Sequence, residues 1–268
     1  MFDKMSGDEV LVFIACCITG LVLWAMWYRD CVMVARLSIR KTSRWLLYCV
    51  PLVSAALLYW VLKNFSSHDV RDDPVYVRFY MAMGAAWLGL TKGLLSWSGL
   101  SARDDVLERG NQPAAYAVSG ALVGLMLCFA GGNIGDGPGW WVVVFAAVLS
   151  TATLWILWIV LDRLTGLADV ITIDRDDGAG VRAAGFFIGS GLALGRAVAG
   201  NWQSASATVA DFLKAAWPAL ALLSVAVAVE RTIKPAVGRD PPSTVVSLIV
   251  ALLYCGLGCL IVVWAGKW

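Results

Sequence analysis

The sequence predicts an all-α polytopic membrane protein of about eight transmembrane helices, built from two-helix hairpin repeats. Hydrophobic side chains make up 60% of the 268 residues and charged side chains only 15%, whereas soluble domains carry about 25% charged residues. Three long stretches, residues 10–28, 137–161 and 241–266, contain no Asp, Glu, Lys or Arg. Because these runs far exceed the roughly ten alternating residues of a membrane β-strand, they favour helices.

Eight apolar runs are candidates for the spanning helices. They cover residues 10–28, 45–62, 76–99, 113–130, 139–161, 181–200, 208–230 and 244–266. Each approaches or exceeds the length that a helix needs to cross a bilayer. Pro51 in the second run and Pro218 in the seventh predict kinks. We divide the chain into an N-terminal hairpin (1–75), a four-helix core with an internal repeat (76–200) and a C-terminal hairpin (201–268).

Basic residues are unevenly distributed between the connections of these runs. The odd-numbered connections hold thirteen of them, namely Arg29, Arg36, Arg40, Lys41, Arg44, Arg103, Arg109, Arg163, Arg175, Arg182, Arg231, Lys234 and Arg239. The other side, including both ends of the chain, holds Lys4, Lys63, Arg71, Arg78 and Lys267. Because positively charged connections stay on the cytoplasmic side, both termini are predicted to lie outside.

The sequence also contains a weak internal repeat. RGNQPAAYAVSGALVG at 109–124 aligns with DRDDGAGVRAAGFFIG at 174–189, an offset of 65 residues. Asn111 and Asp176 are suited to cap the start of a helix. Both copies then carry glycines four residues apart, at Gly120, Gly124, Gly185 and Gly189. Such spacing lets helices approach closely in lipid. A weaker third copy begins near residue 239, which suggests growth by duplication of a two-helix unit.

These residues resemble a known family. The stretch 108–115, followed by Gly120 and Gly124, is similar to the first repeat copy of bacterial inner-membrane proteins of the domain-of-unknown-function 350 family. Residues 174–195 resemble its second copy, although Asp176-Asp177-Gly178 replaces an Asn-Pro-like element. The resemblance covers about residues 76–200. It implies a four-helix core and a multi-pass location in the bacterial inner membrane, and it implies no reaction.

Ionisable residues within the predicted spans are the candidates for a pathway or gate, because charge is costly in a bilayer. From these we select Lys92, Arg196, Asp211 and Lys214. Lys92 either extends its ammonium to the cytoplasmic interface or faces the bundle as a gate or anion-binding group. Arg196 and Asp211 either form a structural ion pair across the hairpin or line a polar vestibule in which Asp211 binds a cation.

Several other classes of site are disfavoured by the residues present. The single histidine, His68, cannot supply a bis-histidine haem or a histidine-rich zinc centre. The acidic stretch 174–178 lacks the bidentate glutamate of an EF-hand. A formal net charge of +2 gives no strong field toward nucleic acid. We therefore expect no enzyme, no cofactor, no metal and no nucleic-acid partner.

Two functions remain at the sequence level. The first is a channel- or transporter-like conduit for an ion or small polar solute, lined or gated by the charged candidates named above. The alternative is a non-catalytic membrane scaffold or subunit that binds partner proteins or lipid through its glycine faces and charged inner connections. The expected partners are membrane lipids together with a second copy of the chain or another membrane protein.

Overall fold

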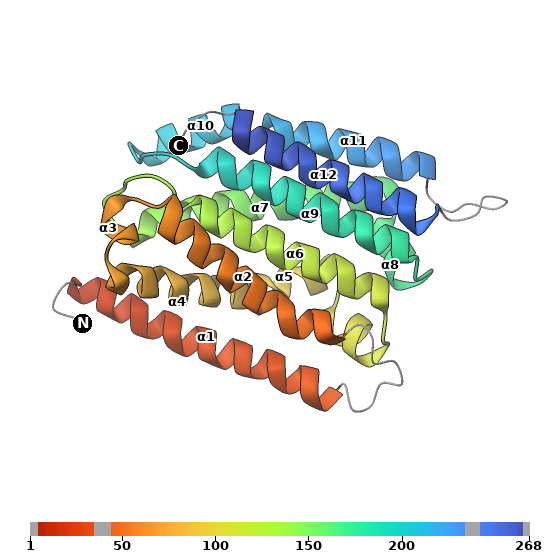
Figure 1. Cartoon of the computed structure of the whole chain (residues 1–268), viewed down its shortest axis with the longest axis horizontal. Coiled ribbons are helices and arrows are strands. Elements are labelled where there is room, and N and C mark those ends of the chain that lie inside the picture. Colours follow the sequence, from red (N-terminus) through yellow and green to blue (C-terminus); the bar gives the residue numbers. More distant parts are fainter. Residues whose placement is uncertain (1–4, 35–43, 234–241, 265–268) are drawn as a thin grey trace.

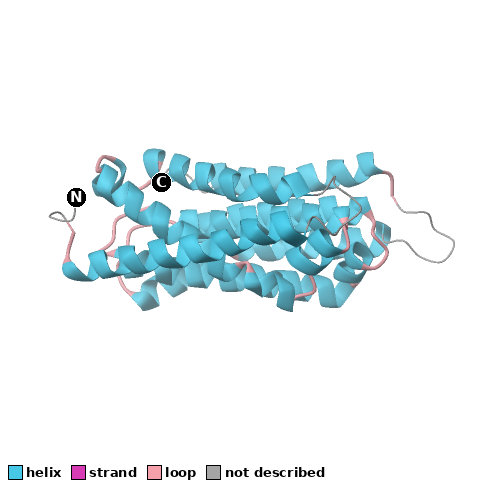
Figure 2. Cartoon of the chain, turned by 90° about the horizontal axis from the view of Figure 1, so that it is seen from below, coloured by secondary structure: helices cyan, strands magenta, loops and turns pink. Residues whose placement is uncertain are grey.

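The computed structural model describes residues 5–34, 44–233 and 242–264, and within these ranges every regular element is a helix (Figure 2). In chain order these are α1 (Gly7–Met33), α2 (Arg44–Asn64), α3 (His68–Arg71), α4 (Pro74–Thr91), α5 (Gly93–Trp97), the π-helix η3 (Ala102–Glu108), α6 (Gln112–Gly131), α7 (Trp140–Thr165), α8 (Leu167–Thr172), α9 (Asp177–Val198), α10 (Ala205–Ala215), α11 (Trp217–Ile233) and α12 (Thr244–Trp264). The chain is an all-α polytopic membrane protein.

Seven segments of the described chain are long and apolar enough to cross a membrane. They are α1, α2, α6, α7, α9, the continuous stretch of α10 and α11, and α12. The third predicted span corresponds to α4, an 18-residue helix that is not among the seven. Arg78 and two tyrosines lower its hydropathy, yet α4 runs beside α1 and α6 along the bundle (Figure 1).

The two prolines singled out in the sequence have different effects. Pro218 lies at the start of α11, directly after a break in the helix at Ala216. Pro51 lies inside α2, which continues without interruption from Arg44 to Asn64. A proline is tolerated in the first turn of a helix because that turn needs no N–H donor there. The seventh predicted span therefore consists of two helices, whereas the second predicted span is one continuous helix.

The helices form two layers of antiparallel hairpins. The second helix of each hairpin, α2, α6, α9 and α12, lies beside the next in chain order, with α6, α9 and α12 in the most extensive contact (Figure 1). The first helices, α1, α4, α7 and α11, pack against this row. The start of α1 and the end of α12 lie at the same end of the bundle (Figure 1). The most completely buried helices, α6 and α9, form its centre.

Glycines allow the helices of the row to approach one another closely. A Cβ atom at Gly120 would lie 2.3 Å from Cα of Ala184, and one at Gly185 would lie 2.6 Å from Cα of Ala251. Gly124 and Gly189 face backbone carbonyls of α9 and α12 in the same way. These distances are shorter than any side chain tolerates, so the contacts α6–α9 and α9–α12 depend on hydrogen at these positions.

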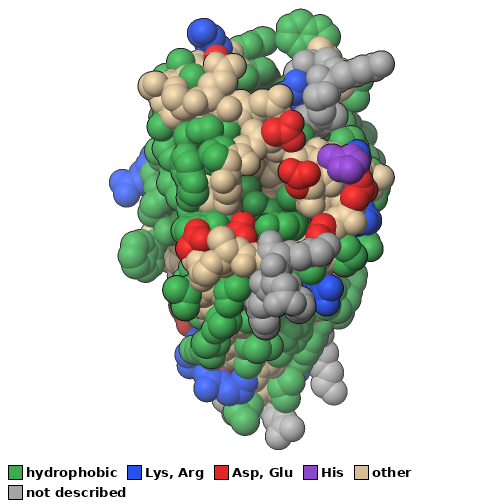
Figure 3. Space-filling model, turned by 90° about the vertical axis from the view of Figure 1, so that its left-hand side faces the viewer, with side chains coloured by type: hydrophobic (Ala, Val, Ile, Leu, Met, Phe, Trp, Pro, Cys, Tyr) green, Lys and Arg blue, Asp and Glu red, His purple; other side chains and the backbone are tan. Residues whose placement is uncertain are grey.

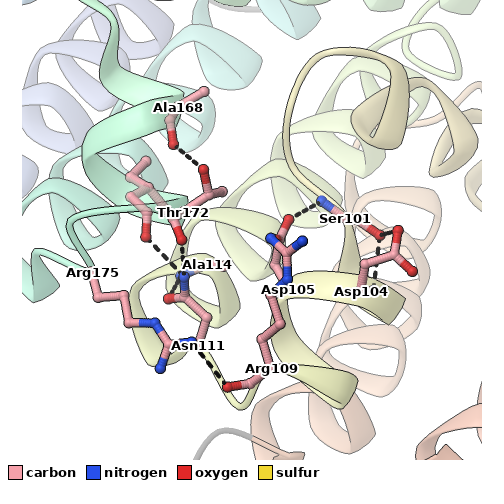
Figure 4. A network of polar contacts seen from close by, with 10 residues as sticks. Ser101, Asp104, Asp105, Arg109, Asn111, Ala114, Ala168, Thr172 and Arg175 are labelled. Carbon is pink, nitrogen blue, oxygen red and sulfur yellow. Dashed lines mark hydrogen bonds and ion pairs between the residues drawn. The ribbon is translucent and has the colours of Figure 1, made fainter.

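The connections before α6 and α9 have matching hydrogen bonds. The N–H of Asn111 donates to Asp105 O at 2.9 Å, and the N–H of Asp176 donates to Val170 O at 3.2 Å, 65 residues further on in each case. Both side chains cap the helix that follows, by accepting from Ala114 N and Gly178 N. Asn111 Nδ2 also donates to Ile171 O at 2.9 Å, which ties the two connections together (Figure 4).

One charge is placed differently from the sequence prediction. Arg182 was assigned to an inner connection, but it lies within α9 and is only 1% exposed. Its Nε and Nη2 atoms contact the two carboxylate oxygens of Glu230 in α11 at 2.7 and 2.9 Å. Its Nη1 donates to Ser247 Oγ in α12 at 2.7 Å. The assignment to a connection is wrong, because an arginine whose three nitrogens each donate a hydrogen bond within the bundle can be buried.

We predict that this buried ion pair stabilises the last hairpin. Arg182→Met or Glu230→Met alone leaves an uncompensated buried charge, so each is expected to lower the free energy of unfolding by about 3 kcal/mol. The double variant removes both charges and should regain most of that loss. Thermal unfolding in detergent measures all three. Additive losses in the double variant would contradict the prediction.

The glycine contacts give a second prediction. Gly120→Ala places a methyl group against the backbone of α9 and should lower the free energy of unfolding by about 1–3 kcal/mol. Gly256→Ala is the matched control, since no heavy atom lies within 4 Å of the added Cβ in α12. It should be neutral or slightly stabilising. Equal melting temperatures for the two variants, again in detergent, would show that the close approach is not needed.

Candidate functional site: an acidic cavity at one end of the bundle

A cavity of about 670 Å³ opens at the end of the bundle where α1 begins and α12 ends. Its wall comes from the first turn of α1, the segment from α3 into α4, and the glycine-rich connection between α6 and α7. Acidic side chains gather on this end of the molecule (Figure 3). Inward, the cavity reaches Tyr80 in α4 and Val143 in α7, both nearly completely buried.

The charge of the cavity wall is negative. Among the described residues, five carboxylates line it, those of Glu9, Asp69, Asp72, Asp73 and Asp136, and the imidazole of His68 is the one basic group of the lining. The Asp72 carboxylate lies 2.9 Å from His68 Nε2 and 3.8 Å from Nε of the neighbouring Arg71. A concave site lined by charge of one sign concentrates ions of the opposite sign. This cavity therefore attracts cations.

Asn133 contributes a buried polar group to the cavity wall. Its side chain is 5% exposed, and its Nδ2 donates to Phe129 O at 2.9 Å. Its Oδ1 atom is also buried and accepts no hydrogen bond. A buried acceptor without a partner costs about 1–3 kcal/mol. Because Asn133 belongs to the cavity lining, we take this unpaired oxygen as an indication of a ligand that carries hydrogen-bond donors, which a small shift of the side chain would bring within reach.

Glu9 is held at the cavity by the start of α1. Its Oε2 accepts the backbone N–H of Ser6 at 2.9 Å and the Tyr76 hydroxyl at 3.4 Å. Ser6 and Glu9 have the spacing of a capping box, in which a glutamate bonds back to the residue that precedes the helix. The cap fixes the carboxylate, and Tyr76 connects it to α4. Glu9 is thus one of two half-buried lining carboxylates held by a helix cap, the other being Asp73, which accepts from Val75 N at 2.8 Å.

The donor set does not form a metal centre. Within residues 5–34, 44–233 and 242–264, no three His, Cys, Asp or Glu side chains are placed to hold a metal ion together. Bare Mg²⁺ or Ca²⁺ needs about six oxygen ligands. The cavity is instead suited to a cation that keeps water around it or carries its own hydrogen-bond donors.

The structure places the predicted gate residue Lys92 away from this cavity. Its ammonium donates to Leu23 O in α1 at 3.1 Å and lies 5.0 and 4.8 Å from the ring centres of Trp24 and Trp27. These contacts secure the joint between α4 and α5 to α1. Lys92 does not line the acidic cavity. Its role as a gate stays a prediction.

The other three pathway candidates also lie outside the cavity. Asp211 and Lys214 are 73% and 79% exposed on α10, where their charged groups are 3.9 Å apart. Asp211 is thus paired with its neighbour one turn along, and not across the hairpin with Arg196. Arg196 ends α9 and lines an apolar crevice between α2 and α12. The structure does not bring the four candidates together.

Sequence reasoning missed the residues that form the cavity. Neither Glu9 nor Asn133 is among the candidates predicted from the sequence, although the pattern Ser6-x-x-Glu9 is typical of a helix start. No sequence signal predicts that the connection between α6 and α7 packs against α1 and α3, because that proximity arises from the arrangement of three hairpins.

Comparison with known proteins provides no assignment, since no protein-family model, curated protein or solved structure matches the chain.

Proposed function

We propose that this integral membrane protein is a conduit for a small ammonium-type cation that enters through the acidic cavity. The observation that carries the proposal is the buried, unsatisfied Oδ1 of Asn133 in a wall that also holds five carboxylates. An ammonium group carries N–H donors and positive charge, so it satisfies the amide oxygen and the carboxylates together. The cavity volume of about 670 Å³ lies within the range of ordinary small-molecule sites.

Glu9 is the carboxylate that we assign to the bound cation. It is half-buried and fixed by the start of α1, whereas Asp69 and Asp136 are exposed at the rim. The exposed carboxylates attract the cation, and screening by salt limits their contribution to affinity. The half-buried carboxylate is screened less and supplies the larger share of binding. In this proposal the exposed carboxylates at the rim attract the cation, and Glu9 inside the cavity binds it.

The cavity is open toward only one end of the bundle. Below Tyr80, the side chains of Met83 and Leu88 belong to the buried apolar core. A transporter that alternates its access exposes its site to one side at a time, so such a closed inner end is expected of one of its states. Passage requires the helices around Tyr80 and Val143 to separate.

The proposed orientation places the cavity outside the cell, with both termini, in a bacterial inner membrane. The described basic residues of the opposite end include Arg103, Arg109, Arg163 and Arg175. The positive-inside rule assigns that end to the cytoplasm. The resemblance to the domain-of-unknown-function 350 family agrees with this location, and the matching hydrogen bonds before α6 and α9 support an origin by duplication.

The scaffold alternative receives less support. It requires the glycine faces and the charged inner connections as binding surfaces. Gly120, Gly124, Gly185 and Gly189 are all used in contacts within the chain, and residues 35–43 of the first inner connection lie outside the described residues. A surface that is buried by α6, α9 and α12 cannot at the same time bind another protein. Assembly with a second copy or a partner would need a different surface.

The orientation has a direct test. Asp136→Cys at the cavity end should react with a membrane-impermeant maleimide in intact cells, because that end faces outside. Asp174→Cys at the opposite end should react only after the membrane is permeabilised. The unsubstituted chain gives the background of its seven cysteines. Labelling of Asp174→Cys, but not of Asp136→Cys, in intact cells would reverse the orientation.

Uptake of radiolabelled methylammonium into liposomes that contain the purified protein tests the conduit. We expect saturable uptake by the unsubstituted protein. Glu9→Gln and Asn133→Leu should each lower uptake at low substrate concentration by about tenfold. A tenfold decrease corresponds to a loss of about 1.4 kcal/mol of binding free energy. Both variants remove a group that binds the cation and leave the helices in place.

Asp211→Asn is the matched control for uptake. It removes an exposed carboxylate that lies on α10, near the same end of the bundle, and does not line the cavity. Uptake should therefore be unchanged. Size-exclusion chromatography of each variant checks that it is folded. Lack of saturable methylammonium uptake, or equal losses in Asp211→Asn and Glu9→Gln, would refute the proposed role of the cavity.

A further inference from the structure

The lining of the acidic cavity changes from charged at the rim to largely apolar at the inner end. At the rim, the carboxylates of Asp69 and Asp136 are exposed. The described lining residues that are at least nine-tenths buried are Tyr80, Asn133, Ile134 and Val143. Three of these contribute an aromatic ring or a branched apolar side chain. A bound molecule therefore meets carboxylates and water at one end and hydrocarbon at the other.

The volume of the cavity is much larger than that of a simple ammonium ion. Methylammonium has two heavy atoms, so it occupies about twice the volume of one water molecule in the liquid, or about 60 Å³. The cavity measures about 670 Å³. An ion of that size at the carboxylates leaves the side chains of Ile134 and Val143 without a bound partner. The space favours a larger cation with an apolar part.

Tyr80 connects the polar and the apolar parts of the wall. It is 8% exposed, and its ring packs edge-on against Phe79 at a centroid distance of 5.0 Å. Its hydroxyl makes no hydrogen bond with a described residue. Helical side chains lean toward the N-terminus of their helix, and α4 begins at the cavity mouth, after Asp73. The hydroxyl thus lies on the side of the ring that faces the mouth.

Three oxygen atoms of the wall can accept hydrogen bonds from one ligand. Both hydrogen bonds of Glu9 within the described residues use Oε2, which leaves Oε1. The Tyr80 hydroxyl is the second acceptor, and Asn133 Oδ1, after a small shift of its side chain, is the third. A primary ammonium group has three N–H donors, one for each of these atoms. A quaternary ammonium group has none.

We propose that the cavity selects a primary amine with a short apolar tail. The ammonium group donates to Glu9, Asn133 and Tyr80, and the tail lies against the Tyr80 ring, Ile134 and Val143. The opposite character of the two ends of the cavity orients the molecule with its charge toward the mouth. This inference rests on the proposed cation site, and it does not depend on passage across the membrane.

Isothermal titration calorimetry of the purified full chain with methyl-, ethyl-, n-propyl- and n-butylammonium tests the tail. Affinity should rise about fourfold for each methylene group, the effect of transferring one such group out of water. Tetramethylammonium has as many carbon atoms as n-butylammonium and no N–H donor. It should bind more than tenfold more weakly than n-butylammonium, because the three acceptors would stay unpaired.

Variants assign the two parts of the ligand to residues. Tyr80→Phe keeps the ring and removes one acceptor, so it should weaken n-butylammonium about tenfold and leave tetramethylammonium unchanged. Tyr59→Phe is the matched control, since Tyr59 is 50% exposed on α2 and does not line the cavity. Val143→Phe fills the inner end. It should abolish the gain from longer tails while methylammonium still binds, whereas a folding defect would weaken every amine.

The failure of this inference differs from the failure of the conduit. Equal affinity for methylammonium and n-butylammonium, or for n-butylammonium and tetramethylammonium, would overturn the selection of a tailed primary amine even if liposomes take up methylammonium. Equal losses in Tyr80→Phe and Tyr59→Phe would overturn the role of the Tyr80 hydroxyl. A rise in affinity with tail length that Val143→Phe abolishes would support the inference even without uptake.

Discussion

The close approach of α6, α9 and α12 is the constraint on which the rest of the structure depends. Inside a bilayer, the hydrophobic effect does not drive helices together, because lipid tails are as apolar as the side chains they would replace. Contact must come from backbones close enough for dispersion and weak hydrogen bonds. Gly120, Gly185 and Gly189 provide that closeness. The positions of the helices that pack on this row depend on it, and so does the alignment of the connections at both ends of the bundle.

The buried pair of Arg182 and Glu230 has a different role from the glycines. Glycine contacts determine how close two helices lie, but they do not determine how far one helix is shifted along the axis of the other. The bidentate pair joins α9 to α11, and Ser247 extends it to α12, so the last hairpin has one favoured register. A buried pair contributes little net stability compared with apolar residues. Its value lies in the high cost of any register that separates the two charges.

The acidic cavity and the apolar crevice between α2 and α12 follow from opposite properties of the same architecture. The acidic cavity lies where connections meet at the end of the bundle, because there the backbone leaves the helices and polar groups can reach water. Asn133 lies at the boundary, close enough to the core to be buried and close enough to the cavity to need a ligand. The apolar crevice lies along the helices, where small residues leave space that larger side chains do not fill. The proposed cation site and the apolar crevice thus lie near the same end of the bundle.

The sequence alone determined the helices, because apolar runs of bilayer length have no other stable structure in lipid. It also predicted Asn111 and Asp176 at helix starts, since caps act within a few residues. Of the kinks predicted at Pro51 and Pro218, only the one at Pro218 lies beside an interruption of the helix. Tertiary structure decided which charges are buried. Arg182 looked like a loop residue until Glu230, 48 positions away, was placed beside it. The cavity likewise needs Glu9 and Asn133 from separate hairpins, and no local pattern records which hairpins become neighbours. Packing between distant segments, and not the composition of any one of them, decided where a ligand can bind.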